Sequence, residues 1–267
     1  MLQKCSPLSR EKLKDLRSLD SMKIRRRKGL CMVEGERSLM EALRTGNLNY
    51  LVVSNERTEG SSFHAGNPEL SDVPCYTLDR ANFRELTDVK AGTGMFGVAS
   101  IPPQRDPHEL GDHPGRATLF YLDGVQEPGN VGALIRTAWA LGFTGVLLGD
   151  GTADPFSAKG VRASAGGVFS LPLYGGVGAP QIGDLESEGF SLFVAASSGQ
   201  DYRTIEYPAR SILALGNEGS GSSDWVLQSG QAVGIPLADG VDSLNVVVAG
   251  GIIAAEMLKK SELSIRD

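Results

Sequence analysis

The sequence predicts an α/β protein with a large C-terminal domain built on a parallel sheet and a smaller N-terminal α/β domain. The following observations lead to this prediction. Short apolar segments alternate with helix-like segments along most of the chain, and a stretch rich in Pro, Gly and charge at 101–115 separates two such runs. The chain of 267 residues is also long enough for two domains, and its composition, 41% hydrophobic and 22% charged, is that of a globular protein.

The first run predicts a small domain over 29–100. In order, it contains a strand "LCMV", a helix "GERSLMEALRTG", strands "NYLVVSN" and "VPCYTL", a helix "RANFRELTD" and a last strand "MFGVASI". We interpret 101–115 as the linker that follows it.

The second run predicts a domain over 116–267. Strand "ATLFYLDGV", helix "VGALIRTAWALG", strand "TGVLLGD" and a helix around "SAKGVRASAGGVF" come first. They are followed by strand "LPLYG", helix "IGDLESEG", strands "SLFVAAS", "SILALG" and "AVGIPLA", and a final helix. Strands that alternate with helices predict a parallel sheet covered on both faces, with ligands beyond the carboxyl ends of the strands.

The charge of the chain is unevenly distributed. Residues 1–28 hold ten Lys and Arg against three Asp and Glu, a local charge of +7, whereas the whole chain carries −6 and the remainder therefore −13. Two interpretations stay open, a solvated or disordered tail and a basic arm that holds RNA phosphates. In the second, neutralising Arg25, Arg26, Arg27 and Lys28 together should weaken RNA binding.

The cysteines and histidines indicate neither a disulfide framework nor a zinc site, because the cysteines are odd in number and widely spaced and the histidines lack ligand intervals. We expect no metal. No apolar run is long enough to cross a membrane and the N-terminus is too polar for a signal peptide, so we expect a cytoplasmic protein without membrane contact.

The first of three Gly-rich polar turns lies at 123–132. Pro128 and Gly129 shape a turn that delivers Asn130 to a helix start, and Arg136 follows near the positive end of that helix, an awkward place for a purely structural cation. A clamp on phosphate or substrate would explain it. The glycines lack the three-glycine pattern of a dinucleotide site, which argues against an oxidoreductase of the Rossmann type.

The other two turns lie at 216–224 and 238–245. In the second turn glycines surround Asn217 and Glu218, so backbone could approach a ligand closely, although a flexible loop is the plainer interpretation. The third turn precedes the final helix, for which Asp242 or Ser243 is the predicted N-cap. That helix has two apolar faces and should therefore be covered on two sides.

Together and in this order, the turns resemble the three motifs of the SpoU (TrmH-like) family of RNA ribose 2′-O-methyltransferases, in the SPOUT superfamily. The matching stretches are "LDGVQEPGNVGALIRTA", "LALGNEGSG" and "IPLADGVDSLNVVVAGGIIAAE", supported by "KGVRASAGGVFSLPL". The resemblance covers about 116–260, and "MVEGERSLMEAL" resembles the start of the small RNA substrate-binding domain of such enzymes. One departure is Phe96-Gly97, where these domains commonly have Gln-Gly.

The resemblance implies a C-terminal domain with a deep trefoil knot that binds S-adenosyl-L-methionine, and a homodimer that acts on RNA. The catalytic residues it implies are Arg136, Asn130, Glu218, Ser243 and Asn245. The cofactor-binding residues it implies are Leu215, Gly216, Asn217, Gly219, Ile235, Pro236, Leu237 and Leu244.

Three points stay open at this level. Arg136 would act as a strongly perturbed base or as a clamp that lets an RNA phosphate assist. Ribosomal RNA is the preferred substrate because the N-terminal domain resembles those of ribosomal-RNA enzymes, and transfer RNA is the alternative. A non-catalytic RNA-binding protein that retains the fold is the competing class.

Overall fold

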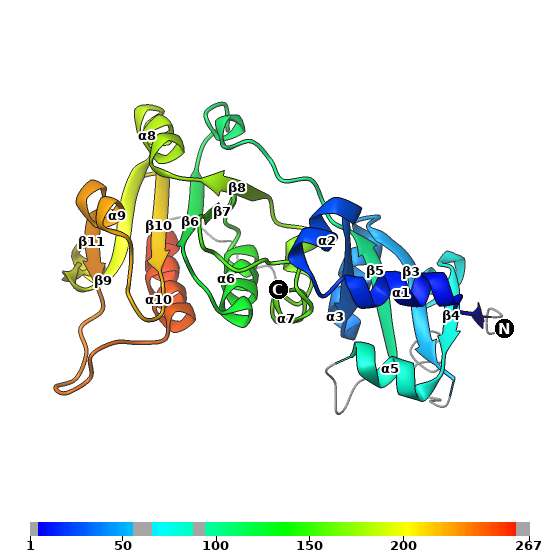
Figure 1. Cartoon of the computed structure of the whole chain (residues 1–267). Coiled ribbons are helices and arrows are strands. Elements are labelled where there is room, and N and C mark those ends of the chain that lie inside the picture. Colours follow the sequence, from blue (N-terminus) through cyan, green and yellow to red (C-terminus); the bar gives the residue numbers. More distant parts are fainter. Residues whose placement is uncertain (1–4, 56–65, 88–93, 260–267) are drawn as a thin grey trace. The chain divides into compact units, whose positions relative to one another are not determined.

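The computed structural model describes residues 5–55, 66–87 and 94–259. Contacts divide the chain into two compact units (Figure 1). Unit 1 comprises 1–103 together with 154–170, and unit 2 comprises 104–153 together with 171–267. No described helix is long and apolar enough to span a membrane.

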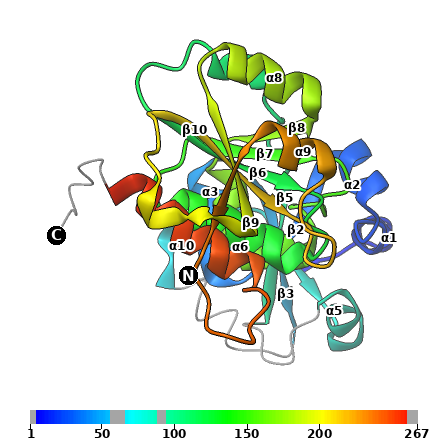
Figure 2. The same cartoon turned by 90° about the vertical axis from the view of Figure 1, so that its left-hand side faces the viewer.

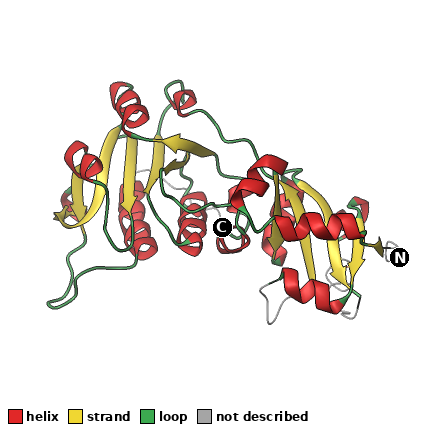
Figure 3. Ribbon diagram, viewed as in Figure 1, coloured by secondary structure: helices red, strands yellow, loops and turns green. Residues whose placement is uncertain are grey.

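Unit 1 is built on a mixed five-stranded sheet (Figure 3). Its strand order is β1 (Ser6–Pro7), β4 (Cys75–Leu78), β3 (Leu48–Ser54), β5 (Met95–Ser100) and β2 (Leu30–Glu34). β4 pairs in parallel with β1 and β3, whereas β5 runs antiparallel to β3 and β2. The glycine of the Phe96-Gly97 pair is explained by packing, because a Cβ there would lie 2.6 Å from Leu39 Cδ2.

The basic N-terminal segment is folded, so its interpretation as a disordered tail is wrong for residues 5–28. It forms helices α1 (Arg10–Ser18) and α2 (Met22–Lys28). Ser9 caps α1 by accepting a hydrogen bond from the Lys12 N–H, and Leu16 is buried in a core cluster with Phe96. Apolar side chains spaced three residues apart within the run of charges hold these helices on the sheet.

Two of the four cations expected to act together on RNA are engaged inside unit 1. Arg25 is only 5% exposed, and its guanidinium donates to Asp154 Oδ2 at 2.6 and 2.8 Å. Lys28 pairs with Asp15 at 2.5 Å. Arg26 and Arg27 are exposed, and neither forms an ion pair or hydrogen bond through its side chain with the described residues. The expectation that all four cations are available to RNA is therefore wrong for Arg25.

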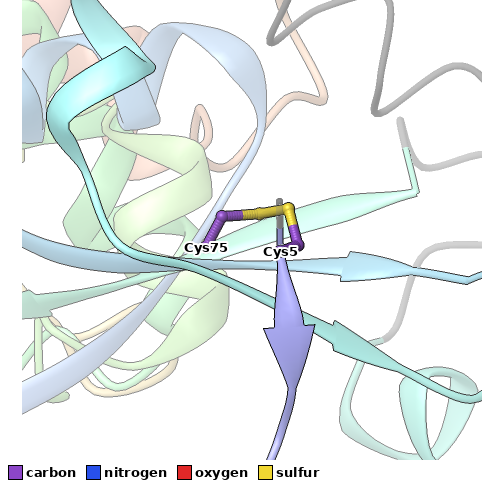
Figure 4. The surroundings of a disulfide bond; sticks show 2 residues. All are labelled: Cys5 and Cys75. Carbon is purple, nitrogen blue, oxygen red and sulfur yellow. A yellow bond between two sulfur atoms is a disulfide. The ribbon is translucent and has the colours of Figure 1, made fainter. Parts of the chain in front are cut away.

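The expectation of no disulfide is also wrong. Cys5 and Cys75 are bonded at a Cα–Cα distance of 4.7 Å, which ties the start of β1 to the start of β4 (Figure 4). Cys31 is the free cysteine and is buried, and burial raises the pKa of its thiol to about 12.

The segment 154–170 lies within the predicted 116–267 domain, but its contacts are with unit 1. Its helix α7 (Ala158–Ala163) packs on β2, and the short helix η3 (Gly167–Phe169) packs on α3 (Glu36–Arg44). Arg162 Nη1 lies 3.0 Å from Glu34 Oε2, a second ion pair that holds this segment in place. Unit 1 also contains α5 (Arg80–Leu86), capped by Asp79, and the short helix η1 (Pro68–Asp72).

Unit 2 contains the predicted parallel sheet, with six strands that are parallel throughout. Its order is β11 (Gln231–Gly234), β9 (Ser191–Asp201), β10 (Arg210–Gly216), β6 (Ala117–Asp123), β7 (Gly145–Gly149) and β8 (Leu173–Val177). β6 and β10 are central neighbours, and Asp123 is paired in register with Gly216, so the turns after these strands emerge side by side.

Helices cover both faces of this sheet (Figure 2). Helices α8 (Ala179–Ser187) and α9 (Asp224–Ser229) pack on one face, where Ile182 and Val226 join a cluster with Tyr121. Helices α6 (Pro128–Ala140) and α10 (Val246–Lys259) pack together on the other face. Because strand side chains alternate in direction, Ala214 faces α8 and α9, whereas Leu215 faces α10.

The final helix α10 shows the two apolar faces that the sequence predicts, but only one of them is covered by other residues that the structure describes. Gly250, Ala254 and Met257 are buried, and a Cβ at Gly250 would lie 2.9 Å from Leu215 Cδ1. On the other face Val248 is 49% exposed. The second face is thus available to a partner.

Candidate active site

The turn after β6 starts α6 earlier than expected and holds Asn130 in its first turn. Pro128 occupies the first helical position, where its missing N–H costs no intrahelical bond, and Glu127 is the N-cap. The Glu127 carboxylate accepts the Asn130 N–H at 2.9 Å. This bond uses the backbone N–H of Asn130, and the Asn130 side chain donates to Glu218 in the neighbouring turn.

The turn after β10 is a short hairpin. Asn217 and Gly221 exchange backbone hydrogen bonds of 3.0 and 2.9 Å, which places Glu218 at the tip. Only glycine fits at Gly216, since a Cβ there would lie 2.2 Å from the Ser222 nitrogen. Gly221 has a φ of 75°, in the left-handed region that favours glycine. The glycines of this turn thus fold the hairpin back onto its own strand end.

The two turns meet at Glu218 and Asn130. The Glu218 carboxylate accepts a hydrogen bond from Asn130 Nδ2 at 2.9 Å and from the N–H groups of Gln126 and Glu127 at 3.2 and 3.3 Å. Burial pushes the Glu218 pKa upward, but these hydrogen bonds favour the ionised form and the net pKa lies below its ordinary value. The site therefore holds a negative charge that accepts hydrogen bonds from three groups of the first turn.

Asn217, predicted as a cofactor ligand, uses its side chain to shape and attach the hairpin. Its Oδ1 accepts the N–H groups of Gly219 and Ser220, and its Nδ2 donates to the Gly124 carbonyl at 3.0 Å. The hydrogen bond from the Gly219 N–H to Asn217 Oδ1 holds Gly219 in the tip of the hairpin.

Arg136 is exposed on α6, and its side chain makes no ion pair or hydrogen bond with the described residues. The prediction that Arg136 lies near the positive end of its helix is wrong, because α6 begins at Pro128 and Arg136 lies eight residues later, more than two turns in. Arg136 differs from Arg25 and Arg162 because its guanidinium has no partner among the described residues.

The third turn leads into α10, and its cap differs from the prediction. Asp242 and Ser243 are exposed and do not cap the helix. Asn245 does, because its Oδ1 accepts the Val247 N–H at 2.9 Å and its carbonyl accepts the Ala249 N–H. Within the described part of the chain, no hydrogen bond joins Arg136, Ser243 or Asn245 to the Asn130–Glu218 pair. The structure thus brings two of the five predicted catalytic residues into direct contact.

A cleft of about 300 Å³ lies at the carboxyl ends of β9 and β11. Its lining includes Ile235, Pro236 and Leu237, three of the predicted cofactor residues, together with Asp201 and Asp242. Apolar walls with a few polar groups are typical of small-molecule sites. The apolar residues of this lining suit a ligand with a flat apolar ring, such as the adenine of S-adenosyl-L-methionine.

The other predicted cofactor residues do not line this cleft. Leu215 and Gly216 are buried at the end of β10, Asn217 and Gly219 belong to the hairpin, and Leu244 is exposed before α10. Among the described residues, no group of His, Cys, Asp or Glu is arranged to hold a metal ion.

Two residues of this region were not singled out from the sequence. Asp123 ends β6, and its Oδ2 accepts both the N–H and the hydroxyl of Ser223, at 2.6 and 2.9 Å. An acidic residue that closes an otherwise apolar strand was the available signal for Asp123. Nothing in the sequence pointed to Ser223 as its partner, 100 residues away.

Comparison with known proteins identifies the family of the chain. The model of the SpoU rRNA Methylase family matches residues 117–255, and that of an MRM3-like substrate binding domain matches 10–97. The 23S rRNA (guanosine(2553)-2′-O)-methyltransferase RlmP of Bacillus subtilis is 31% identical over 246 residues, 91% of this chain and 94% of the relative. The 23S rRNA (adenosine(1067)-2′-O)-methyltransferase of Streptomyces azureus is 32% identical over 71% of each chain.

A solved structure is similar over almost the whole chain. The AdoMet-bound rRNA methyltransferase from Sinorhizobium meliloti superimposes with a TM-score of 0.79 at 28% identity and covers 95% of this chain and 96% of that chain.

The parallel-sheet domain, its joined turns and these similarities define an S-adenosyl-L-methionine-dependent RNA ribose 2′-O-methyltransferase with a SPOUT fold. The cofactor of this class supplies an activated methyl group. The chain belongs to the SpoU rRNA Methylase family.

Proposed function

We propose that this chain methylates a ribose 2′-OH of 23S ribosomal RNA. The observation that carries the proposal is the Glu218–Asn130 contact between neighbouring strand ends, in the same unit as the unpaired Arg136 and the apolar cleft. The relatives from Bacillus subtilis and Streptomyces azureus are named for 23S rRNA but for different nucleotides. We therefore propose the same class of RNA, 23S rRNA, for this chain, and experiment must identify the nucleotide.

Each site residue has a role in this proposal. A ribose hydroxyl is a weak nucleophile, so it must be oriented and must lose its proton as it attacks. Arg136 has a free guanidinium for the ribose or a neighbouring phosphate, and phosphate assistance fits an always-charged group better than direct proton abstraction. Glu218 and Asn130 order the substrate side of the site, and Asn245 and Ser243 stand at the entrance to α10.

The N-terminal unit is proposed to hold the RNA. Its match to a substrate binding domain covers 10–97, which includes both basic helices. The exposed cations Arg26 and Arg27 on α2 are free to contact phosphates, whereas the body of the chain is acidic and offers little diffuse attraction.

The active enzyme is proposed to be a homodimer in the cytoplasm, with the segment before α10 forming the knot. Support for the dimer comes from Val241, Leu244 and Val248, apolar residues that are 49%, 36% and 49% exposed along this segment and the uncovered face of α10. Burial of such a face favours self-association.

The substrate is tested by methyl transfer from labelled S-adenosyl-L-methionine to purified RNA. We expect label in 23S rRNA from a strain that lacks this protein, and none in 23S rRNA already modified by it. Label in transfer RNA alone would favour the alternative substrate, and no transfer to either RNA, despite cofactor binding, would favour a non-catalytic RNA-binding protein.

A further inference from the structure

The hairpin that carries Glu218 is attached to the exit of β6 at both of its legs. The incoming leg is held by Asn217, whose Nδ2 donates to the Gly124 carbonyl at 3.0 Å. The outgoing leg is held by Ser223, whose N–H and hydroxyl both donate to Asp123 Oδ2. Two consecutive residues of one strand exit thus hold both legs of the turn that follows the neighbouring strand.

The Asp123–Ser223 contact is not accounted for by local secondary structure. Asp123 is only 9% exposed, and a buried carboxylate costs free energy unless it accepts hydrogen bonds. Ser223 occupies the N-cap position of α9, but its side chain makes no capping bond there. Its hydroxyl instead donates to Asp123, which joins the two turns.

The attachment determines where the Glu218 carboxylate lies. Glu218 is at the tip, between the paired residues Asn217 and Gly221, and its three donors all belong to residues 126–130. A shift of either leg would therefore carry the carboxylate away from Asn130. Displacements of an ångström in such groups are enough to slow a reaction substantially.

We propose that Asp123 and Asn217 are positioning residues, which act through the hairpin to hold Glu218 on Asn130 and do not themselves touch substrate or cofactor. This inference gives Asn217 a different role from the cofactor ligand implied by the family resemblance. It rests on the proposed function, in which Glu218 and Asn130 order the RNA.

Two substitutions weaken the attachment of each leg separately, and the Ser223 N–H bond to Asp123 remains in the second. Asn217→Asp keeps the oxygen that accepts the Gly219 and Ser220 N–H groups but replaces the donor to the Gly124 carbonyl by a second oxygen. Ser223→Ala removes the hydroxyl donor to Asp123, and Ser223→Thr restores it. The matched control is Ser187→Ala, which removes an exposed hydroxyl that donates to the Gly183 carbonyl within α8 of the same unit.

Steady-state kinetics are measured for each variant alone and combined with Glu218→Gln. We expect Asn217→Asp and Ser223→Ala to lower kcat about tenfold with the cofactor KM unchanged, Ser223→Thr to recover most of it, and Ser187→Ala to have no effect. In the Glu218→Gln background the two substitutions should cause little further reduction of kcat, because their effect passes through Glu218. Unchanged kcat, or an equal reduction in both backgrounds, would overturn the inference.

Amide hydrogen exchange at Gln126 and Glu127 gives a second measurement that does not depend on activity. Both N–H groups donate to Glu218, so their exchange should accelerate in Asn217→Asp and Ser223→Ala and stay unchanged in Ser187→Ala. Unaltered exchange in the first two variants overturns the positioning role. Accelerated exchange in a protein that methylates no RNA overturns the proposed function alone.

Discussion

Asn130 Nδ2 and Glu218 Oε1 lie 2.9 Å apart although 88 residues separate them in the sequence. They meet because β6 and β10 are adjacent parallel strands whose carboxyl ends share one edge of the sheet, and each is followed by a turn rich in glycine. The contact joins two of the three turns that identify the family.

Replacing Glu218 by Gln should destabilise the protein in a pH-dependent way. The folded-state pKa of Glu218 lies below its ordinary value of 4.5, so the ionised carboxylate contributes stability above that pH and loses the contribution as pH falls through the lower, folded value. Melting temperatures of wild type and Glu218→Gln should therefore differ most near neutral pH and converge in acid. A constant difference across this range would show that the charge is not involved.

Arg25→Met should destabilise unit 1 by about 3–5 kcal/mol, because it leaves the Asp154 carboxylate buried without its cation. The double variant Arg25→Met with Asp154→Leu should regain much of this stability, since both charges are then gone. Urea denaturation measures both values. Additive destabilisation in the double variant would mean that the two residues do not act as a pair.

The salt dependence of RNA binding separates structural cations from those proposed to bind phosphate. Arg26→Gln with Arg27→Gln should flatten the slope of log affinity against log salt by about 0.7 for each single-stranded phosphate that these arginines neutralise. Arg25→Met, which also removes a cation from α2, is the control and should leave the slope unchanged. Equal slopes for all three proteins would remove α2 from the RNA interface.

Reduction of the Cys5–Cys75 disulfide should lower the melting temperature, because the bond closes a loop of 70 residues and constrains the unfolded chain by up to about 4 kcal/mol. Cys5→Ser should melt at the lower temperature with or without reductant. Native alkylation after reduction should label Cys5 but spare Cys31, whose thiol is buried and has a raised pKa. Identical melting with and without reductant would show that the bond does not form in solution.

Val248→Glu should convert the proposed dimer to a monomer at micromolar concentration, because it places a charge on the uncovered apolar face of α10. Sedimentation gives the mass. The control is Leu227→Glu, at an exposed apolar residue of α9 on the opposite face of the sheet, which should stay dimeric. A wild-type mass equal to one chain would contradict the dimer itself.

The sequence predicted most of unit 2 and two of the turns because their signals are local. Alternating apolar segments mark the strands, Pro128 marks a helix start, and Gly216 marks a position where only glycine fits. The N-cap of α10 was harder to predict, because Asp242, Ser243 and Asn245 are all residue types that cap helices. Asn245 is the cap because α10 begins at Val246.

What the sequence could not show depends on contacts between distant residues. Cys5 meets Cys75, Arg25 meets Asp154, and Ser223 meets Asp123 only after the sheets have set the strand order. Helices α1 and α2 of the basic segment could not be predicted for a similar reason. Leu16 is one apolar residue among many charges, and its burial is decided by the sheet it packs on.

The most direct test of the proposed activity is 2′-O-methylation mapping of 23S rRNA from three strains, which lack the protein, carry the wild type or carry Arg136→Ala. A group that acts on the reacting ribose contributes mainly in the transition state, so Arg136→Ala should bind the cofactor normally and leave the site unmethylated. We predict one ribose that is methylated only with the wild-type protein. A methylation pattern that is the same in all three strains would contradict the account.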